Sequence, residues 1–176
     1  MKSLGKPILQ LELARNEDDI RAILMKGDKP RNLADARAGN LLDTWLFIPG
    51  YAGLLLTLGL LLARGTCRDS LLIAALVLVP VIAIADWTEN AGIERAIEHI
   101  APDHGEPHPG DAHRISTPSI VKWTLIAVVL LWYGVAGVIS VPAWRAVWPG
   151  VIAIIALIAG FAEARQLAGY FRERFF

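Results

Sequence analysis

The sequence predicts an all-α integral membrane protein: a four-transmembrane-helix bundle with a short N-terminal cytoplasmic β-α segment. Four apolar stretches, at residues 45–63, 70–85, 123–144 and 146–162, contain no charged side chain, and the first runs for 19 positions. A span needs roughly 20 apolar residues to cross about 30 Å of hydrocarbon. These stretches are also apolar all round, whereas a helix of a soluble bundle keeps a polar face with a 3.6-residue period. We therefore expect a transmembrane domain over residues 41–176, with spans at about 43–63, 70–90, 120–141 and 146–169.

The distribution of basic residues predicts the orientation of these spans. The chain has 17 basic and 17 acidic side chains, so its net charge is zero, but fourteen of the basic residues flank one end of the predicted spans. Because Lys and Arg concentrate on the cytoplasmic side of membrane proteins, both termini are expected in the cytoplasm, which in a bacterial cell means the inner (plasma) membrane. The chain has no dense basic tract, which argues against nucleic acid as a partner. Its single cysteine, Cys67, excludes an internal disulfide.

Residues 1–40 form the predicted cytoplasmic N-terminal segment. Leucines alternate with other residues in PILQLELA (residues 7–14), which predicts a short strand. Asn16, followed by acidic residues, predicts the start of an amphipathic helix that ends at Gly27. The stretch KGDKPRN (residues 26–32) is expected to be a linker. The apolar face of the helix must pack on the bundle, on the lipid surface or on a membrane or cytoplasmic protein partner.

The first two spans each contain a proline at a similar distance from a carboxylate. Pro49 follows Asp43, and Pro80 precedes Asp86, by six residues in each case, which is about 9 Å along a helix. A proline removes a backbone hydrogen bond and tends to kink its helix. Paired kinks would open a small polar pocket at the cytoplasmic end. The alternative is that these are ordinary membrane-helix prolines, which are common.

Polar residues gather where the second span ends, in the stretch IADWTENAGIE. Asp86, Glu89 and Asn90 are spaced i, i+3 and i+4, so they share one helix face, and that face continues through Ile93 and Ile97 to a helix end near Ile100. The topology brings further polar residues to the same end of the bundle, and the full candidate site is Asp43, Tyr51, Asp86, Glu89, Asn90 and Glu163.

Three interpretations of this candidate site stay open. In the first it is structural: Asp43 favours a helix N-terminus electrostatically, while Asp86 and Glu89 pair with arginines such as Arg95 or Arg165. In the second, Asp43, Asp86, Glu89 and Asn90 hold a divalent cation, and their oxygen ligands suit Mg²⁺, Ca²⁺ or Mn²⁺. In the third, the carboxylates belong to an ion or proton pathway.

A second candidate is the histidine-containing loop HIAPDHGEPHPGDAHR, which contains His99, His104, His108 and His113. Its spacings of five, four and five residues differ from the tighter ligand pairs that build most zinc sites. A solvated polar loop is the expected interpretation. A metal site completed by Glu89 or Glu94, or a pH-sensitive interface, is the alternative.

The stretches LLDTWLFIPGYAGLLL and DWTEN resemble a group of uncharacterised small four-span bacterial membrane proteins. These proteins have an Asp-x-x-x-Phe-x-x-x-Tyr first span and an Asp-x-x-Glu-Asn end to the second span. The matching positions are Asp43, Phe47, Tyr51, Asp86, Glu89 and Asn90. The resemblance covers the first half of the chain and implies no mechanism, because the group has no assigned activity.

The stretch DWTEN is also similar to the calcium-binding Asp-Trp-Cys-Glu-x-Asn stretch of alkaline ceramidases. Here the cysteine is missing, Asn90 is one residue closer, and no zinc-binding histidines lie on the predicted spans. These departures argue against carrying the calcium site over to this chain.

The leading functional hypothesis is therefore a small polytopic inner-membrane protein that serves as a structural or accessory membrane component. The alternative is a divalent-cation-dependent enzyme or binder acting on lipid head groups, in which Asp86 and Glu89 hold the metal while Asp43 and Tyr51 position or protonate the substrate. A small ion or proton transporter is the third hypothesis. Whether the chain is an enzyme stays open.

Overall fold

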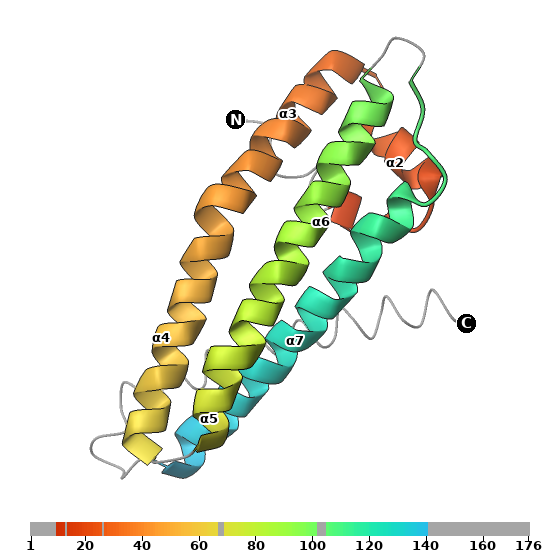
Figure 1. Ribbon diagram of the computed structural model, residues 1–176. Coiled ribbons are helices and arrows are strands. Elements are labelled where there is room, and N and C mark those ends of the chain that lie inside the picture. The colour runs from red at the N-terminus through yellow and green to blue at the C-terminus, as the bar shows by residue number, and fades with distance from the viewer. Residues whose placement is uncertain (1–9, 13, 26, 67–68, 102–104, 141–176) are drawn as a thin grey trace. The chain divides into compact units, whose positions relative to one another are not determined.

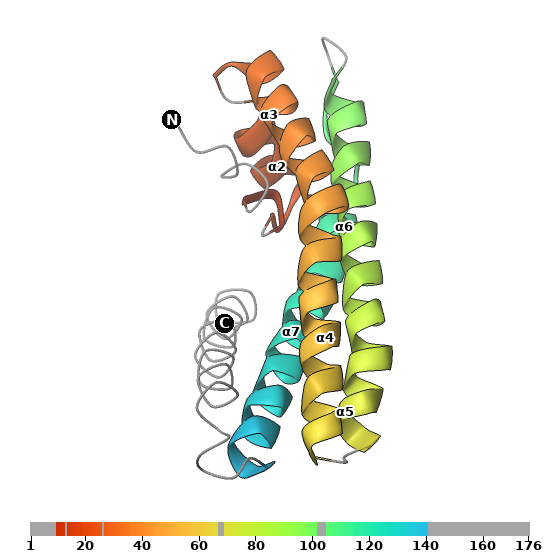
Figure 2. The same ribbon diagram turned by 90° about the vertical axis from the view of Figure 1, so that its left-hand side faces the viewer.

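The structure, a computed structural model, describes residues 10–12, 14–25, 27–66, 69–101 and 105–140 (Figure 1). Every regular element in these ranges is helical. Their order is α2 (Glu17–Leu24), α3 (Lys29–Leu42), η1 (Asp43–Phe47), α4 (Ile48–Thr66), α5 (Asp69–Ile73), η2 (Ala74–Leu78), α6 (Val79–Ile100) and α7 (Asp111–Ser140). The segments η1 and η2 are π-helical turns, so α3 runs through η1 into α4 without a break, and α5 runs through η2 into α6 (Figure 2).

The predicted fold class, a four-span bundle with an N-terminal β-α segment, is wrong. Residues 10–12, within the predicted strand, are helical, and no strand occurs in the described ranges. The leucine alternation covers too few positions to decide between a strand and a helix: Leu11 and Ala14, three residues apart, are both buried, as on one helix face. Three described helices, not four, are long and apolar enough to cross a membrane. The predicted fourth span, 146–169, lies outside the described residues.

Helix α2 confirms the capped helix predicted from local signals. The Asn16 side chain accepts a hydrogen bond from the backbone N–H of Asp19 at 2.9 Å, as an N-cap residue does. The helix is followed by Gly27, whose φ of 79° suits glycine because it has no Cβ. Ile20 and Leu24 are fully buried, so the apolar face of α2 packs inside the protein itself.

Helix α3 replaces most of the predicted linker. Asp28 caps this helix by accepting a hydrogen bond from the Arg31 backbone N–H at 3.2 Å, and Pro30 lies in the first turn. Proline is favoured there because its fixed φ suits a helix and its missing N–H would have no intrahelical partner. The linker prediction failed because it took glycine and proline as breakers, whereas here they precede and open a helix.

The three membrane-length helices extend well beyond the thickness of a bilayer core. They are Lys29–Arg64 with 36 residues, Asp69–Ile100 with 32 and Asp111–Ala136 with 26. At 1.5 Å per residue the first is about 54 Å long, compared with about 30 Å of hydrocarbon. The predicted continuation of the second span to Ile100 is confirmed.

Each π-helical turn ends two residues before a proline. Pro49 follows η1, which ends at Phe47, and Pro80 follows η2, which ends at Leu78. A proline ring collides with the carbonyl four residues earlier and supplies no N–H. A local i→i+5 pattern relieves this conflict by widening the helix there. The local response to both prolines is thus a π-helical turn within a continuous helix.

Contacts divide the chain into two compact units. The first unit is Met1–Gly50 with Ile84–Ile120, and the second is Tyr51–Ala83 with Val121–Phe176. Each described part has its own apolar core. The first core includes Leu11, Ile20, Leu24, Ala36, Ile93, Ile97, Ile100 and Ile115. The second includes Leu55, Leu62, Leu71, Val79, Ile82, Val129 and Tyr133.

In the second unit, Gly59 marks a close approach of α4 to its neighbours. A Cβ at this position would overlap the Tyr133 hydroxyl and would lie 2.7 Å from the Ala75 Cβ. At Gly53, on the same helix, a Cβ would meet nothing within 4 Å.

We predict that Gly59→Ala lowers the free energy of unfolding by about 1–3 kcal/mol, because the added methyl group overpacks a filled contact. Gly53→Ala is the matched control and should be neutral or slightly stabilising, because alanine favours the helix. Thermal unfolding of both variants in mild detergent measures the difference. Equal melting temperatures for the two variants would contradict the close approach.

Candidate functional site

Four residues of the candidate site, Asp43, Asp86, Glu89 and Asn90, lie in the first unit, where α3 and η1 pack against α6. The Asn90 side-chain amide donates hydrogen bonds to Asp43 Oδ2 at 2.8 Å and to Thr44 Oγ1 at 2.9 Å. In return, Asn40 Nδ2 donates to the Asn90 backbone carbonyl at 3.1 Å. Trp87 Nε1 donates to the Thr44 carbonyl at 3.4 Å. We call the set Asn40, Asp43, Thr44, Asp86, Glu89 and Asn90 the polar cluster.

Helix periodicity explains why α6 contributes three members to the polar cluster. Asp86, Glu89 and Asn90 have exposed fractions of 2%, 0% and 4%. They continue the face that carries Ile93 and Ile97 in the apolar core. All three side chains are thus buried, and Asn90 contacts Asp43.

Asn40 and Thr44 belong to the polar cluster but were not among the predicted site residues. Both lie within one helical turn of Asp43, and Asn40 is buried. The spacing of Asn40 and Thr44, i and i+4, matches that of Asp86 and Asn90 on the facing helix. This pattern was visible in the sequence, but the predicted domain boundary after residue 40 divided it.

The structure removes one reason for the structural interpretation of Asp43. This residue was expected to start a helix and to interact with the helix N-terminus. Instead it lies in the interior of a helix that begins at Lys29, so no free N–H groups surround it. Arg95, one of the proposed partners of the carboxylates, is exposed and forms no ion pair with any described residue. Arg165, the other, lies outside the described residues.

The remaining two predicted members are Tyr51 and Glu163. Tyr51 belongs to the second unit, where it packs against the apolar core. Glu163 lies outside the described residues.

Asn40 Oδ1 and Ser119 Oγ are buried oxygen atoms of the first unit that have no hydrogen-bond partner among the described residues. Asn40 Oδ1 belongs to the amide that contacts Asn90, so it lies at the polar cluster. A buried acceptor without a partner is costly, which favours an ordered water, a proton donor or a small cation beside it. Among the described residues, however, no three or more His, Cys, Asp or Glu side chains are grouped as a metal site would require.

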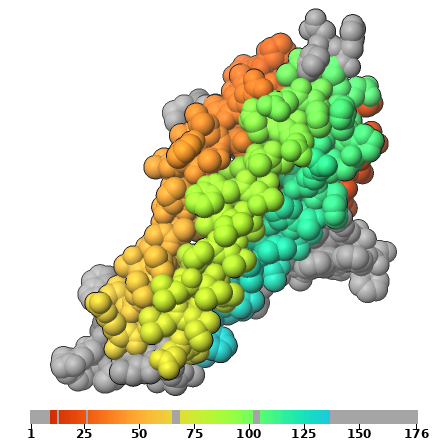
Figure 3. Space-filling model, in the orientation of Figure 1, coloured from red at the N-terminus to blue at the C-terminus, as the bar shows by residue number. Residues whose placement is uncertain are grey.

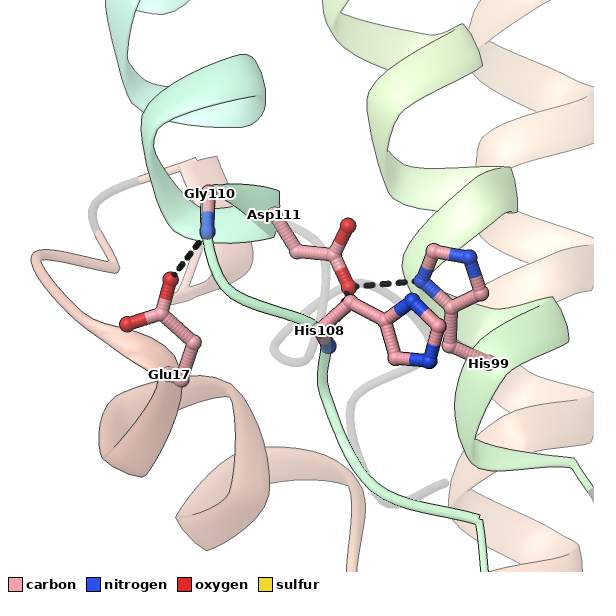
Figure 4. A network of polar contacts seen from close by, with 5 residues as sticks. All are labelled: Glu17, His99, His108, Gly110 and Asp111. Atoms are coloured by element: carbon pink, nitrogen blue, oxygen red, sulfur yellow. Dashed lines mark hydrogen bonds and ion pairs between the residues drawn. The ribbon is translucent and has the colours of Figure 1, made fainter.

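The histidines of the second candidate form a small network around Asp111 (Figure 4). His99 Nδ1 lies 2.8 Å from Asp111 Oδ2, and the same oxygen accepts a hydrogen bond from the His108 backbone N–H at 2.8 Å. The His99 and His108 rings stack with centroids 3.8 Å apart. Stacked rings direct their nitrogen lone pairs roughly parallel, so the two rings are poorly arranged to bind one metal ion.

The remaining two histidines do not complete a metal site. His113 is exposed, and its ring contacts Thr117 on the same helix at 3.2 Å. His104 lies outside the described residues.

The described part of this loop is attached to α2 on its other side. Glu17 Oε1 accepts a hydrogen bond from the Gly110 backbone N–H at 2.8 Å, and Arg21 forms an ion pair with Glu106 at 2.9 Å (Figure 4 shows the first of these contacts). The loop residues 105–110 are thus held by α2, α6 and the start of α7. Asp111, which was not singled out as a site residue, is the centre of this arrangement.

The class that these observations define is a helical membrane protein, with three described helices long and apolar enough to cross a bilayer. Comparisons with protein-family models, with curated proteins and with solved structures give no match for this chain.

We predict that Asn90→Asp destabilises the protein by about 1–3 kcal/mol, because it replaces a donor by an acceptor facing Asp43 and leaves buried groups unsatisfied. The exchanged pair Asp43→Asn with Asn90→Asp restores an amide-to-carboxylate hydrogen bond and should recover part of that loss. Thermal unfolding of both variants tests this coupling. If the double variant is less stable than Asn90→Asp alone, the contact between these two side chains is not energetically significant.

Proposed function

We propose that the protein is a structural or accessory component of a bacterial inner membrane, in which the polar cluster joins two membrane helices to each other. The single observation that supports this function is the use of the Asn90 side chain, which gives both of its amide hydrogens to side chains of the neighbouring helix, at 2.8 and 2.9 Å. Groups positioned to bind a substrate would instead direct such donors into an open space.

The strength of hydrogen bonds between membrane helices also supports a positioning role, in which the polar cluster aligns α3 with α6. Side-chain hydrogen bonds between membrane helices contribute only about 0.6 kcal/mol on average. A few of them add little stability, but a misaligned helix pair would leave buried polar groups without partners, at about 1–3 kcal/mol each. The polar cluster thus selects one alignment of α3 and α6 over others.

A second candidate function is a divalent-cation-dependent binder or enzyme acting on lipid head groups. The unpartnered Asn40 Oδ1 favours it, because a cation beside this atom would satisfy a buried acceptor.

The substitution Glu89→Gln separates these functions, because it keeps the shape of a fully buried side chain and replaces its carboxyl group by an amide. We predict a change below about 1 kcal/mol in the free energy of unfolding, with no dependence on added Mg²⁺ or Ca²⁺. Thermal melting with and without each ion measures both effects. Glu98→Gln, at an exposed position on the same helix, is the matched control.

Two other outcomes would contradict the positioning role. A melting temperature that rises with Mg²⁺ or Ca²⁺ in the native protein but not in Glu89→Gln would support the cation-dependent function. An ion-independent loss of about 3–5 kcal/mol would show that Glu89 neutralises a buried cationic side chain.

The orientation belongs to the same proposal: both termini in the cytoplasm, supported by the excess of Lys and Arg at one end of the apolar segments. Cys67 is the only cysteine, so it reports the position of the connection between the first two membrane-length helices.

We predict that a membrane-impermeant thiol reagent labels Cys67 in intact spheroplasts. In a Cys67→Ser background, Ala101→Cys at the opposite end of α6 should react only after the membrane is permeabilised. The reverse pattern would refute the orientation.

A further inference from the structure

Arg95 and Arg114 differ from other arginines of the first unit in having no ion-pair partner among the described residues. Arg21 pairs with Glu106 at 2.9 Å, Arg37 with Glu94 at 3.0 Å, and Arg31 approaches Asp35 at 3.9 Å. Arg95 and Arg114 are both exposed, and neither forms an ion pair or side-chain hydrogen bond with a described residue. No carboxylate of the described residues compensates these two positive charges, so they can attract an external anion.

These two arginines lie on neighbouring helices at a point of close contact. A Cβ on Gly92 of α6 would lie 3.1 Å from the Arg114 carbonyl oxygen and 3.3 Å from Ile115 Cγ1 of α7. Figure 3 shows the surfaces of α6 and α7 adjoining along this face. Arg95 lies one turn after Gly92, and Arg114 lies beside it on α7, so both arginines border the same seam.

Helix geometry brings the two side chains to a similar level along this seam. In an α-helix the Cα–Cβ bonds tilt toward the N-terminus of the helix. Because α6 and α7 run antiparallel here, the Arg95 and Arg114 side chains tilt in opposite directions along the seam. Arg95 lies about 4–5 Å farther along α6 than the Gly92 contact, so these tilts bring the two side chains to a common level. Two neighbouring cations repel each other, and an anion between them relieves this repulsion.

The exposed surface becomes apolar along both helices on one side of these arginines. On α6 the exposed residues Ile84 and Trp87 precede them, and on α7 the exposed face turns apolar from Val121 onward. Arg95 lies about 12 Å beyond Trp87 along α6. A tryptophan is typical of the membrane interface, so Trp87 indicates the level of the interface on α6. The long Arg95 side chain can extend from its position beyond Trp87 toward a lipid head group at that interface.

We propose that Arg95 and Arg114 form a binding site for the phosphate of an anionic phospholipid. The two guanidinium groups supply charge and hydrogen-bond donors in the planar arrangement that suits phosphate. The apolar face of α6 that carries Ile84 and Trp87 accommodates an acyl chain. A free phosphate has no acyl chain, so this face favours a lipid as the ligand. This site is separate from the polar cluster and does not depend on its role.

The test uses the purified full-length protein and measures bound lipid by native mass spectrometry, with phosphatidylglycerol and phosphatidylcholine as probes. The native protein should prefer phosphatidylglycerol. Arg95→Gln and Arg114→Gln should each weaken phosphatidylglycerol binding about fivefold, and together about 25-fold, because a basic residue at an anionic surface contributes about one such factor. Binding of phosphatidylcholine should not change.

The matched control is the double variant Arg21→Gln with Arg31→Gln, which removes the same charge from arginines that already have carboxylate partners. It should retain phosphatidylglycerol binding within about twofold. Equal losses in both double variants would show that only net charge matters and would overturn the site. Unchanged binding in the Arg95 and Arg114 double variant would overturn it as well.

The source of the phosphate is tested with glycerol 3-phosphate as a competitor. If the site binds the lipid, millimolar glycerol 3-phosphate should displace little phosphatidylglycerol. Glycerol 3-phosphate has no acyl chain and therefore binds more weakly than the lipid. Complete displacement would overturn the lipid assignment in favour of a soluble phosphate ligand. Melting temperatures of all variants in phosphatidylcholine confirm that they fold.

Discussion

The arrangement of the first unit depends on one constraint: polar groups removed from water must find hydrogen-bond partners inside the protein. Asn90 is 4% exposed and places its amide between Asp43 and Thr44, while Asn40 reaches the Asn90 carbonyl. These contacts require the two helices to be aligned residue by residue. An apolar interface alone would tolerate several alignments, because dispersion contacts have little directionality.

The polar cluster also has a fixed place along each helix. On α6, Val79 and Ile82 belong to the second core, Asp86, Glu89 and Asn90 follow, and Ile93 and Ile97 belong to the first core. On the helix that begins with α3, Ala36 of the first core precedes the polar residues and Leu55 of the second core follows them. In the order of the sequence, polar residues thus separate the residues of one apolar core from those of the other on both helices.

The charged surface of the first unit shows how exposure alone can mislead. Several arginines are exposed, yet Arg21 and Arg37 have carboxylate partners within 3.0 Å, so their charge is largely compensated. Arg95 and Arg114 are distinguished by the absence of such partners among the described residues and by the close approach of their helices at Gly92. Neither property can be recognised from the count of basic residues, which predicts only the orientation of the chain.

The sequence by itself determined the features that depend on neighbouring residues. These are the capped helix from Asn16 to Gly27, the membrane-length apolar segments in the described ranges, and the shared face of Asp86, Glu89 and Asn90, because capping and helical periodicity act over one or two turns. Only the tertiary structure decided whether residues 10–12 join a helix, whether the glycine and proline near residue 30 interrupt or open one, and which residues face α6. Asn40, Thr44 and Asp111 owe their roles to contacts with residues from another helix or loop, and such contacts follow from packing.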